Sequence, residues 1–196
     1  QAKALGAAMA AGKRRNVSVL KKRLSDFRAR VPLFKKVRKS IGAKRTNMLL
    51  QTGGVSALVY GQFTTGISCS MLYAQRVAVA SAGNCISGEL DLTLCIMDGR
   101  AHGRVDPAYS AHTDPIVSWA EAVWGQWMPS GDLDLLSSGA SSSVQHAKSK
   151  WAGVHGPATA CWASLDRLQW QGFSAFKWTT DRGMEIDLRR DSPAFV

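Results

Sequence analysis

Four aspartates have side chains of a type that could hold a divalent metal ion, because paired carboxylates suit Mg²⁺. They are Asp91, Asp98, Asp106 and Asp114. Nothing in their spacing brings them together, and three of them have a structural interpretation. Asp98-Gly and Asp106-Pro are turn dipeptides, and Asp114 stands where it can cap a helix. The sequence therefore favours turns and a cap over a magnesium site.

A second set has the residue types that zinc prefers, namely Cys85, Cys95, His102 and His112. Their spacing is loose and contains no CxxC or HxxxH pair, so no zinc site is predicted. The serines lack a GxSxG elbow, and the Gly53-Gly54 pair is not followed by the lysine of a phosphate-binding loop. We therefore expect no catalytic residue, no metal site and no cofactor in this segment.

The chain holds four cysteines, and none of them forms a CxxC pair. Four cysteines in 196 residues is ordinary for a protein of a reducing compartment. We therefore expect Cys69, Cys85, Cys95 and Cys161 to be reduced and mostly buried.

Positive charge is the feature that points to a partner. The net charge is +11, and residues 1–50 hold 15 Lys or Arg against one acid, Asp26, whereas the rest of the chain is slightly acidic. This asymmetry indicates a polyanion, nucleic acid first and an anionic membrane second. The alternative is a solvated cationic face with no partner. The candidate nucleic-acid-binding residues are Lys13, Arg14, Arg15, Lys21, Lys22, Arg23, Arg28, Arg30, Lys35, Lys36, Arg38 and Lys39.

These cations need a helix to position them, and the apolar residues between them predict one. Val17, Leu20, Leu24, Phe27 and Val31 recur at steps of three and four, which places them on one stripe of a helix with the cations off it. The pattern predicts a first helix capped by Asn16 and ended by Pro32, and a second, shorter one before Gly42. The apolar stripe is narrow and lacks tryptophan, which favours packing inside the protein over a membrane surface.

The middle of the chain is apolar, rich in glycine and expected to be helical. Residues 47–61 read as a buried helix loosened by two glycines, and Ser68 or Ser70 can cap the next helix. Residues 90–96 are ambiguous between strand and helix, with helix preferred. No apolar run approaches the roughly 18 residues of a membrane span.

The clearest helix signal starts at Asp114, an expected N-cap, with Pro115 at the first helical position. Apolar residues then recur through Trp119, Trp124 and Trp127, a stripe that we interpret as core rather than as a platform for stacking bases. The serine-rich stretch 137–143 is interpreted as a loop or a weak helix.

The last part combines a helix with a hairpin. Gly156-Pro157 opens a predicted helix, and residues 173–180 and 184–188 flank Asp181-Arg182-Gly183, a hairpin signal in which glycine supplies the left-handed position. The sequence therefore predicts a mainly α protein with a basic helical N-terminal part, a helical middle and a small C-terminal β-hairpin. The expected segments are 1–67, basic helical; 68–150, helical connection; and 151–196, helix plus hairpin.

Several short motifs, taken in order, resemble one family. They are Lys3-Ala-Leu-Gly with Ala-Gly-Lys13-Arg-Arg, Leu58-Val-Tyr-Gly61, Gly66-Ile-Ser-Cys-Ser-Met-Leu72, Asp114-Pro-Ile-Val-Ser-Trp119, Leu168-Gln-Trp-Gln-Gly172 and Trp178-Thr-Thr-Asp-Arg-Gly-Met-Glu-Ile-Asp-Leu188. Each motif alone is weak, but their order resembles the thumb and downstream region of non-LTR (LINE-type) retrotransposon reverse transcriptases, as in microalgal protist retroelements. The resemblance covers most of the chain.

The resemblance implies a thumb and connection that hold a template-primer duplex, RNA/DNA or RNA, while other segments of a parent polyprotein polymerise. The family's Tyr-x-Asp-Asp turn and its Cys/His knuckle are not in this sequence. Mg²⁺ is accordingly expected only in the polymerase core of the parent, and this segment is expected not to be catalytic by itself. Because the sequence has no initiator Met, we expect it to be a piece of a longer reading frame.

The alternative from another class is a non-enzymatic basic helical interaction module that binds RNA or an acidic protein. Under either hypothesis we expect an intracellular protein, in the nucleus or the cytoplasm, with no membrane partner. An autonomous enzyme is the third and weakest hypothesis.

Overall fold

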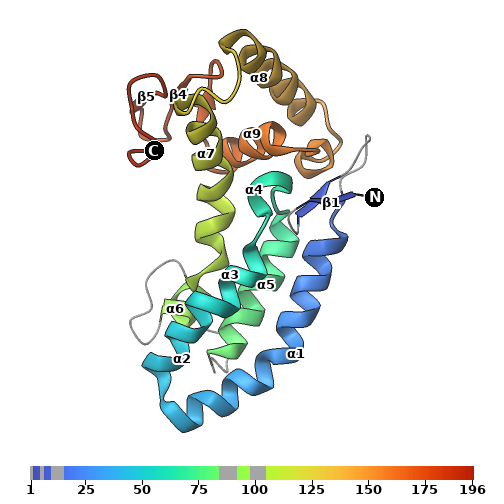
Figure 1. Ribbon diagram of the computed structural model, residues 1–196, viewed down its shortest axis with the longest axis vertical. Coiled ribbons are helices and arrows are strands. Elements are labelled where there is room, and N and C mark those ends of the chain that lie inside the picture. Colours follow the sequence, from blue (N-terminus) through green and yellow to red (C-terminus); the bar gives the residue numbers. More distant parts are fainter. Residues whose placement is uncertain (1, 5–6, 10–15, 84–91, 98–104) are drawn as a thin grey trace. The chain divides into compact units, whose positions relative to one another are not determined.

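A computed structural model describes residues 2–4, 7–9, 16–83, 92–97 and 105–196 (Figure 1). The candidates Lys13, Arg14, Arg15, Cys85, Asp91, Asp98 and His102 lie outside the described residues, and so does the side chain of Cys95. The predicted mainly α fold with a small C-terminal sheet is confirmed. The chain gathers into two compact units. Unit 1 comprises Gln1–Asn16, Gly61–Gly66 and Ala111–Val196, and unit 2 comprises Val17–Tyr60 and Ile67–Ser110.

Unit 2 is helical and is built around the long basic helix α1. Its helices are α1 (Ser18–Ile41), α2 (Ala43–Leu49), the π-helical η1 (Leu50–Val55), α3 (Ser56–Val59), α5 (Cys69–Ala82) and α6 (Leu92–Met97). The predicted stripe of α1 is the buried one, since Leu20, Leu24 and Phe27 are all at most 5% exposed. Leu24 and Phe27 pack in a core with Leu50, Val55, Leu58 and Val79 from the neighbouring helices.

Pro32 does not end the first helix, contrary to the prediction. It lies inside α1, which continues as one helix to Ile41 and ends before Gly42, where φ is +83°. Proline removes the N–H that would bond to the carbonyl of Arg28. Pro32 and Arg28 are both exposed, so water can satisfy that carbonyl, while Val31 and Phe34 pack against the core on either side. The predicted cap at Asn16 is also wrong, because Val17 occupies the cap position.

The other helices predicted for unit 2 are present in the structure. The segment from residue 43 to residue 59 is helical throughout, and the two glycines fall in its π-helical part. Gly54 is buried, and a Cβ built there would lie 3.1 Å from Phe34 and 3.3 Å from Phe27. Ser68 is at the N-cap of α5, and the ambiguous segment forms helix α6.

In the described residues, unit 1 combines four α-helices with a two-stranded and a three-stranded sheet. Its elements are β1 (Ala2–Ala4), β2 (Ala7–Met9), α4 (Gln62–Thr65), α7 (Pro107–Trp124, of which residues 111–124 belong to unit 1), α8 (Ser130–Gln145), the 3₁₀ turn η3 (Lys150–Gly153), α9 (Pro157–Arg167), β3 (Gln171–Gly172), β4 (Lys177–Thr179) and β5 (Glu185–Asp187). Strands β1 and β2, which the sequence did not predict, pair antiparallel with Ala2 opposite Met9. The serine-rich stretch 137–143 is part of helix α8.

The predicted hairpin is present and carries one further strand. Strands β4 and β5 pair antiparallel with Trp178 opposite Ile186, and β3 pairs with the other edge of β4. Gly183 has φ +77°, the left-handed position that the turn needs. Trp178, Ile186 and Leu188 face the same core as Trp119 of α7 and Trp162 of α9. The two last-named rings meet edge to face with centroids 5.3 Å apart.

Helix α7 begins one Asp-Pro dipeptide earlier than predicted. Asp106 and Pro107, not Asp114 and Pro115, start it: the Asp106 Oδ1 accepts from the Ala108 N–H at 2.9 Å. Pro115 lies inside the helix, where its missing N–H leaves the carbonyl of Ala111 without its helical donor. The Arg167 guanidinium donates to that carbonyl at 3.4 Å.

The tryptophan stripe is only partly core. Trp119 is buried, but Trp124 is 49% exposed and Trp127 is 68% exposed, contrary to the prediction. The reason is that α7 ends at Trp124 and the chain turns at Gln126, where φ is +52°. Trp127 therefore lies beyond the helix whose 3.6-residue period placed it on the buried face.

Candidate nucleic-acid interface

Nine of the twelve predicted cations lie on α1, and most of them face solvent. Lys21, Lys22, Arg28, Arg30, Lys35, Lys36 and Lys39 are exposed, whereas Arg23 and Arg38 are half-buried. The apolar stripe of α1 packs in the core of unit 2 and holds the helix in place. The helix therefore presents a rigid, positively charged surface.

One row of these cations follows the helix axis. Lys21, Arg28 and Lys35 are spaced by seven residues, so they lie on nearly the same side, with Lys39 one further turn along. Seven residues of α-helix rise about 10.5 Å, so neighbouring cations of the row are separated by about that distance along the axis. A row of cations of this length can contact several phosphates of one duplex.

The single acid of α1 cancels little of this charge. Asp26 pairs with Lys22 at 3.1 Å, one turn away along the helix, and both side chains are at least half exposed. Exposed pairs of this kind are worth about 0–1 kcal/mol and are screened by salt. The pair occupies Lys22 and leaves the other exposed cations of the helix unchanged.

Arg23 has a structural role that its charge alone did not reveal. Its guanidinium donates to the backbone carbonyl of Tyr60 and lies 5.1 Å from the centre of the Tyr60 ring. Burial lowers the pKa of Arg23, and the nearby Tyr60 phenol acts in the opposite direction. Arginine stays charged at neutral pH in proteins, so this contact ties α1 to the end of α3.

Two exposed cations that the sequence reasoning left out extend the basic surface. Lys44 and Arg45 follow Gly42 on α2, which packs against α1. The signal for them was present in the same run of positive charge. They were missed because the apolar periodicity that marked the first helices ends before Gly42.

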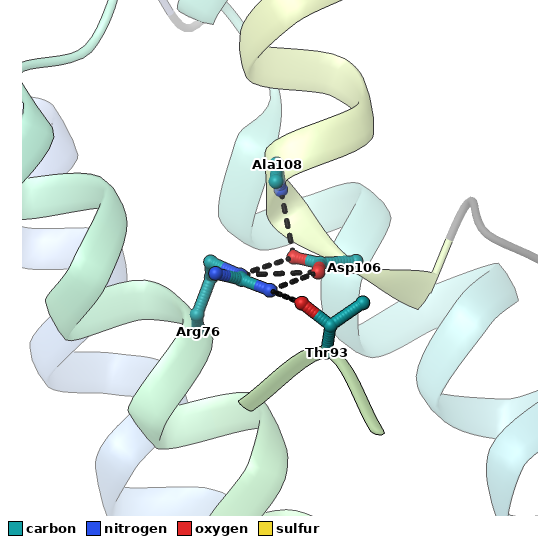
Figure 2. Close-up of polar contacts among 4 residues, drawn as sticks. All are labelled: Arg76, Thr93, Asp106 and Ala108. Carbon is teal, nitrogen blue, oxygen red and sulfur yellow. Dashed lines mark hydrogen bonds and ion pairs between the residues drawn. The ribbon is translucent and has the colours of Figure 1, made fainter. Parts of the chain in front are cut away.

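One polar cluster of unit 2 is a structural network (Figure 2). Both carboxylate oxygens of Asp106 accept hydrogen bonds from Arg76 at 2.8–3.0 Å, and the same guanidinium donates to the Thr93 hydroxyl at 2.7 Å. Asp106 also holds the first turn of α7 through Ala108. Both of its carboxylate oxygens are engaged inside the protein, so this predicted metal candidate serves as a cap and an ion-pair partner.

The remaining metal candidates do not assemble in the part of the chain that the structure describes. Asp114 lies within α7, where its carboxylate accepts from the neighbouring Thr113 hydroxyl at 3.4 Å. Within those residues no group of three or more His, Cys, Asp or Glu side chains could hold a metal ion.

The two cysteines with described side chains differ in environment. Both have free thiols, but Cys69 is exposed at the start of α5 and Cys161 is buried in α9. Burial raises the pKa of the Cys161 thiol, so it stays protonated and unreactive. The expectation of a buried thiol is therefore confirmed for Cys161 and wrong for Cys69.

Comparisons with known proteins leave the family open. No family model, no curated protein and no solved structure matches this chain. Among the helices of the described residues, none has both the length and the apolar character needed to cross a bilayer.

Proposed function

We propose that this chain binds a nucleic-acid duplex, RNA/DNA or RNA, through phosphate contacts made by α1. The observation that carries the proposal is the exposure of seven cations of α1 on a helix whose apolar stripe is buried. Contacts of this kind position a duplex without reading its sequence. Affinity then falls steeply as salt rises, because each neutralised phosphate releases counterions.

The proposal extends to the role implied by the short motifs whose order along the chain resembles LINE-type reverse transcriptases. A duplex-holding helical segment without catalytic residues would serve as the thumb and connection of a LINE-type reverse transcriptase. The template-primer would be its partner, and other segments of the polyprotein would supply the metal-dependent chemistry. A mainly helical fold with seven exposed cations on one long helix supports this role.

The experiment is a titration of an RNA/DNA hybrid at several salt concentrations, with the wild type and a variant in which four exposed cations become glutamine. These are Arg30, Lys35, Lys36 and Lys39, all exposed on α1. We expect wild-type binding that is steeply salt-dependent and indifferent to sequence. In the variant, the slope of log affinity against log salt should fall by about 0.9 for each phosphate that the protein no longer neutralises. A slope that does not change contradicts the proposal.

A protein-binding module is the second candidate function, and a feature of unit 1 favours it. Trp124, Trp127 and Met128 are exposed and line a cavity of about 790 Å³, and Arg189 is also part of the lining. Exposed tryptophan and arginine are enriched where proteins bind one another. Tight binding of an acidic protein, lost on Trp127→Ala and accompanied by no affinity for a duplex, would favour this function over the first.

A further inference from the structure

The side of α1 that meets α5 carries a groove. The two helices pack against each other within unit 2 (Figure 1), and the groove between them measures about 360 Å³. The lining residues come from both helices: Lys21, Leu24, Ser25, Arg28, Ser70, Met71 and Ala74.

The lining has the chemistry of an anion site. Lys21 and Arg28 bring two positive charges, and neither makes an ion pair with another residue that the structure describes. Among the described residues, no carboxylate lines the groove, and the one acid of α1, Asp26, is paired with Lys22. The hydroxyls of Ser25 and Ser70, one from each wall, add donors that can meet an anionic oxygen.

The inner wall of the groove is apolar, which favours an anion that is joined to a larger organic group. Leu24 is buried, and Met71 and Ala74 are half-buried beside the two cations. A cationic rim over an apolar wall suits a phosphate together with the sugar that follows it. The volume lies near the lower end of the range for small-ligand sites, which is about 300–1,000 Å³.

We infer that this groove seats one backbone phosphodiester of the bound strand, with Lys21 and Arg28 on its oxygens and the sugar against Met71. The inference rests on the proposed function and deepens it. It makes the groove the fixed point of the duplex on unit 2, while the cations further along α1 contribute charge without a shaped site.

The test fills the groove without changing any charge. Ser25→Phe and Ser70→Phe place a ring on opposite walls, and both positions are exposed, so the fold of unit 2 should tolerate them. Ala29→Phe is the matched control, because Ala29 is exposed on α1 and is not part of the groove lining. Each full-length variant is titrated with the RNA/DNA hybrid at fixed salt and compared with the glutamine variant of α1.

We expect each groove-filling variant to weaken hybrid binding about tenfold, and Ala29→Phe to bind like the wild type. Unchanged binding by both groove variants, with the glutamine variant still impaired, would overturn the groove inference and leave the proposed function standing. No binding of the hybrid by the wild type would overturn both. Weakening by Ala29→Phe equal to that of the groove variants would also overturn the inference, because any bulky side chain on α1 would then suffice.

Discussion

At the residue scale, the Asp106 carboxylate links Arg76 of α5 to the first turn of α7, and the Arg76 guanidinium also bonds Thr93 of α6. The Asp106 side chain is 9% exposed and that of Arg76 is 22% exposed, so the pair is shielded from water and from salt. An ion pair in such a place does not by itself prove a gain in stability, but removing one partner strands the other charge.

Asp106→Asn is therefore expected to destabilise unit 2 by about 3 kcal/mol, because it leaves the Arg76 guanidinium without its counter-charge while keeping the shape of the side chain. Amide hydrogen exchange of α5 measures this destabilisation locally. The matched control is Asp26→Asn, which breaks the exposed pair with Lys22 and should change stability by about 0.5 kcal/mol or less. Equal effects of the two substitutions would mean that the Arg76 pair is effectively solvated.

At the element scale, the sequence predicted the presence of helices more reliably than it predicted their first and last residues. The predictions of a buried stripe on α1 and of a hairpin turn at Gly183 were correct, because burial and a left-handed turn are local consequences of the residues. Pro32 and Pro115 were taken as boundaries, yet both lie inside helices. Those helices stay continuous because of contacts with groups outside the helices themselves.

Helix α7 shows the reason in one hydrogen bond. The Ala111 carbonyl loses its donor at Pro115 and gains one from Arg167, which lies 56 residues further along the chain and also stacks 4.2 Å from the Trp151 ring. No pattern within the helix contains that information. The same limit applied to the candidate site: charge located α1, but only the packing of α5 showed a groove beside Lys21 and Arg28.

The neighbouring glycines of η1 provide a matched pair for testing this packing. Gly53→Ala meets open space and should stabilise unit 2 by about 0.4–1 kcal/mol, because alanine loses less backbone entropy on folding. Gly54→Ala should instead destabilise it, by about 1–3 kcal/mol, because the new methyl group presses on Phe34 and Phe27. Hydrogen exchange of α1 and α5 measures both. A gain of stability at both positions would show that the π-helical segment shifts easily to make room for the added methyl group.

At the scale of the whole molecule, charge and tryptophan are separated along the chain. The excess of cations lies in residues 1–50, whereas all seven tryptophans lie at or after position 119 and so belong to unit 1. Total charge would attract a polyanion wherever the cations were placed, through long-range attraction that salt screens. Binding that depends on phosphate contacts requires the cations to lie on one rigid surface. These two origins of affinity can be told apart because the rest of the chain also carries exposed cations.

Two variants with the same net charge separate them. One replaces Arg30, Lys35, Lys36 and Lys39 of α1 with glutamine, and the other replaces four exposed cations of unit 1 with glutamine, namely Lys177, Arg182, Arg189 and Arg190. We expect the salt slope of the α1 variant to fall by about 0.9 for each phosphate that it no longer neutralises, and the unit 1 variant to keep the wild-type slope. Hybrid titrations across a range of salt measure both slopes. An equal fall in the two variants would mean that net charge, and not the surface of α1, governs the binding, because only a shared long-range field treats cations at both places alike.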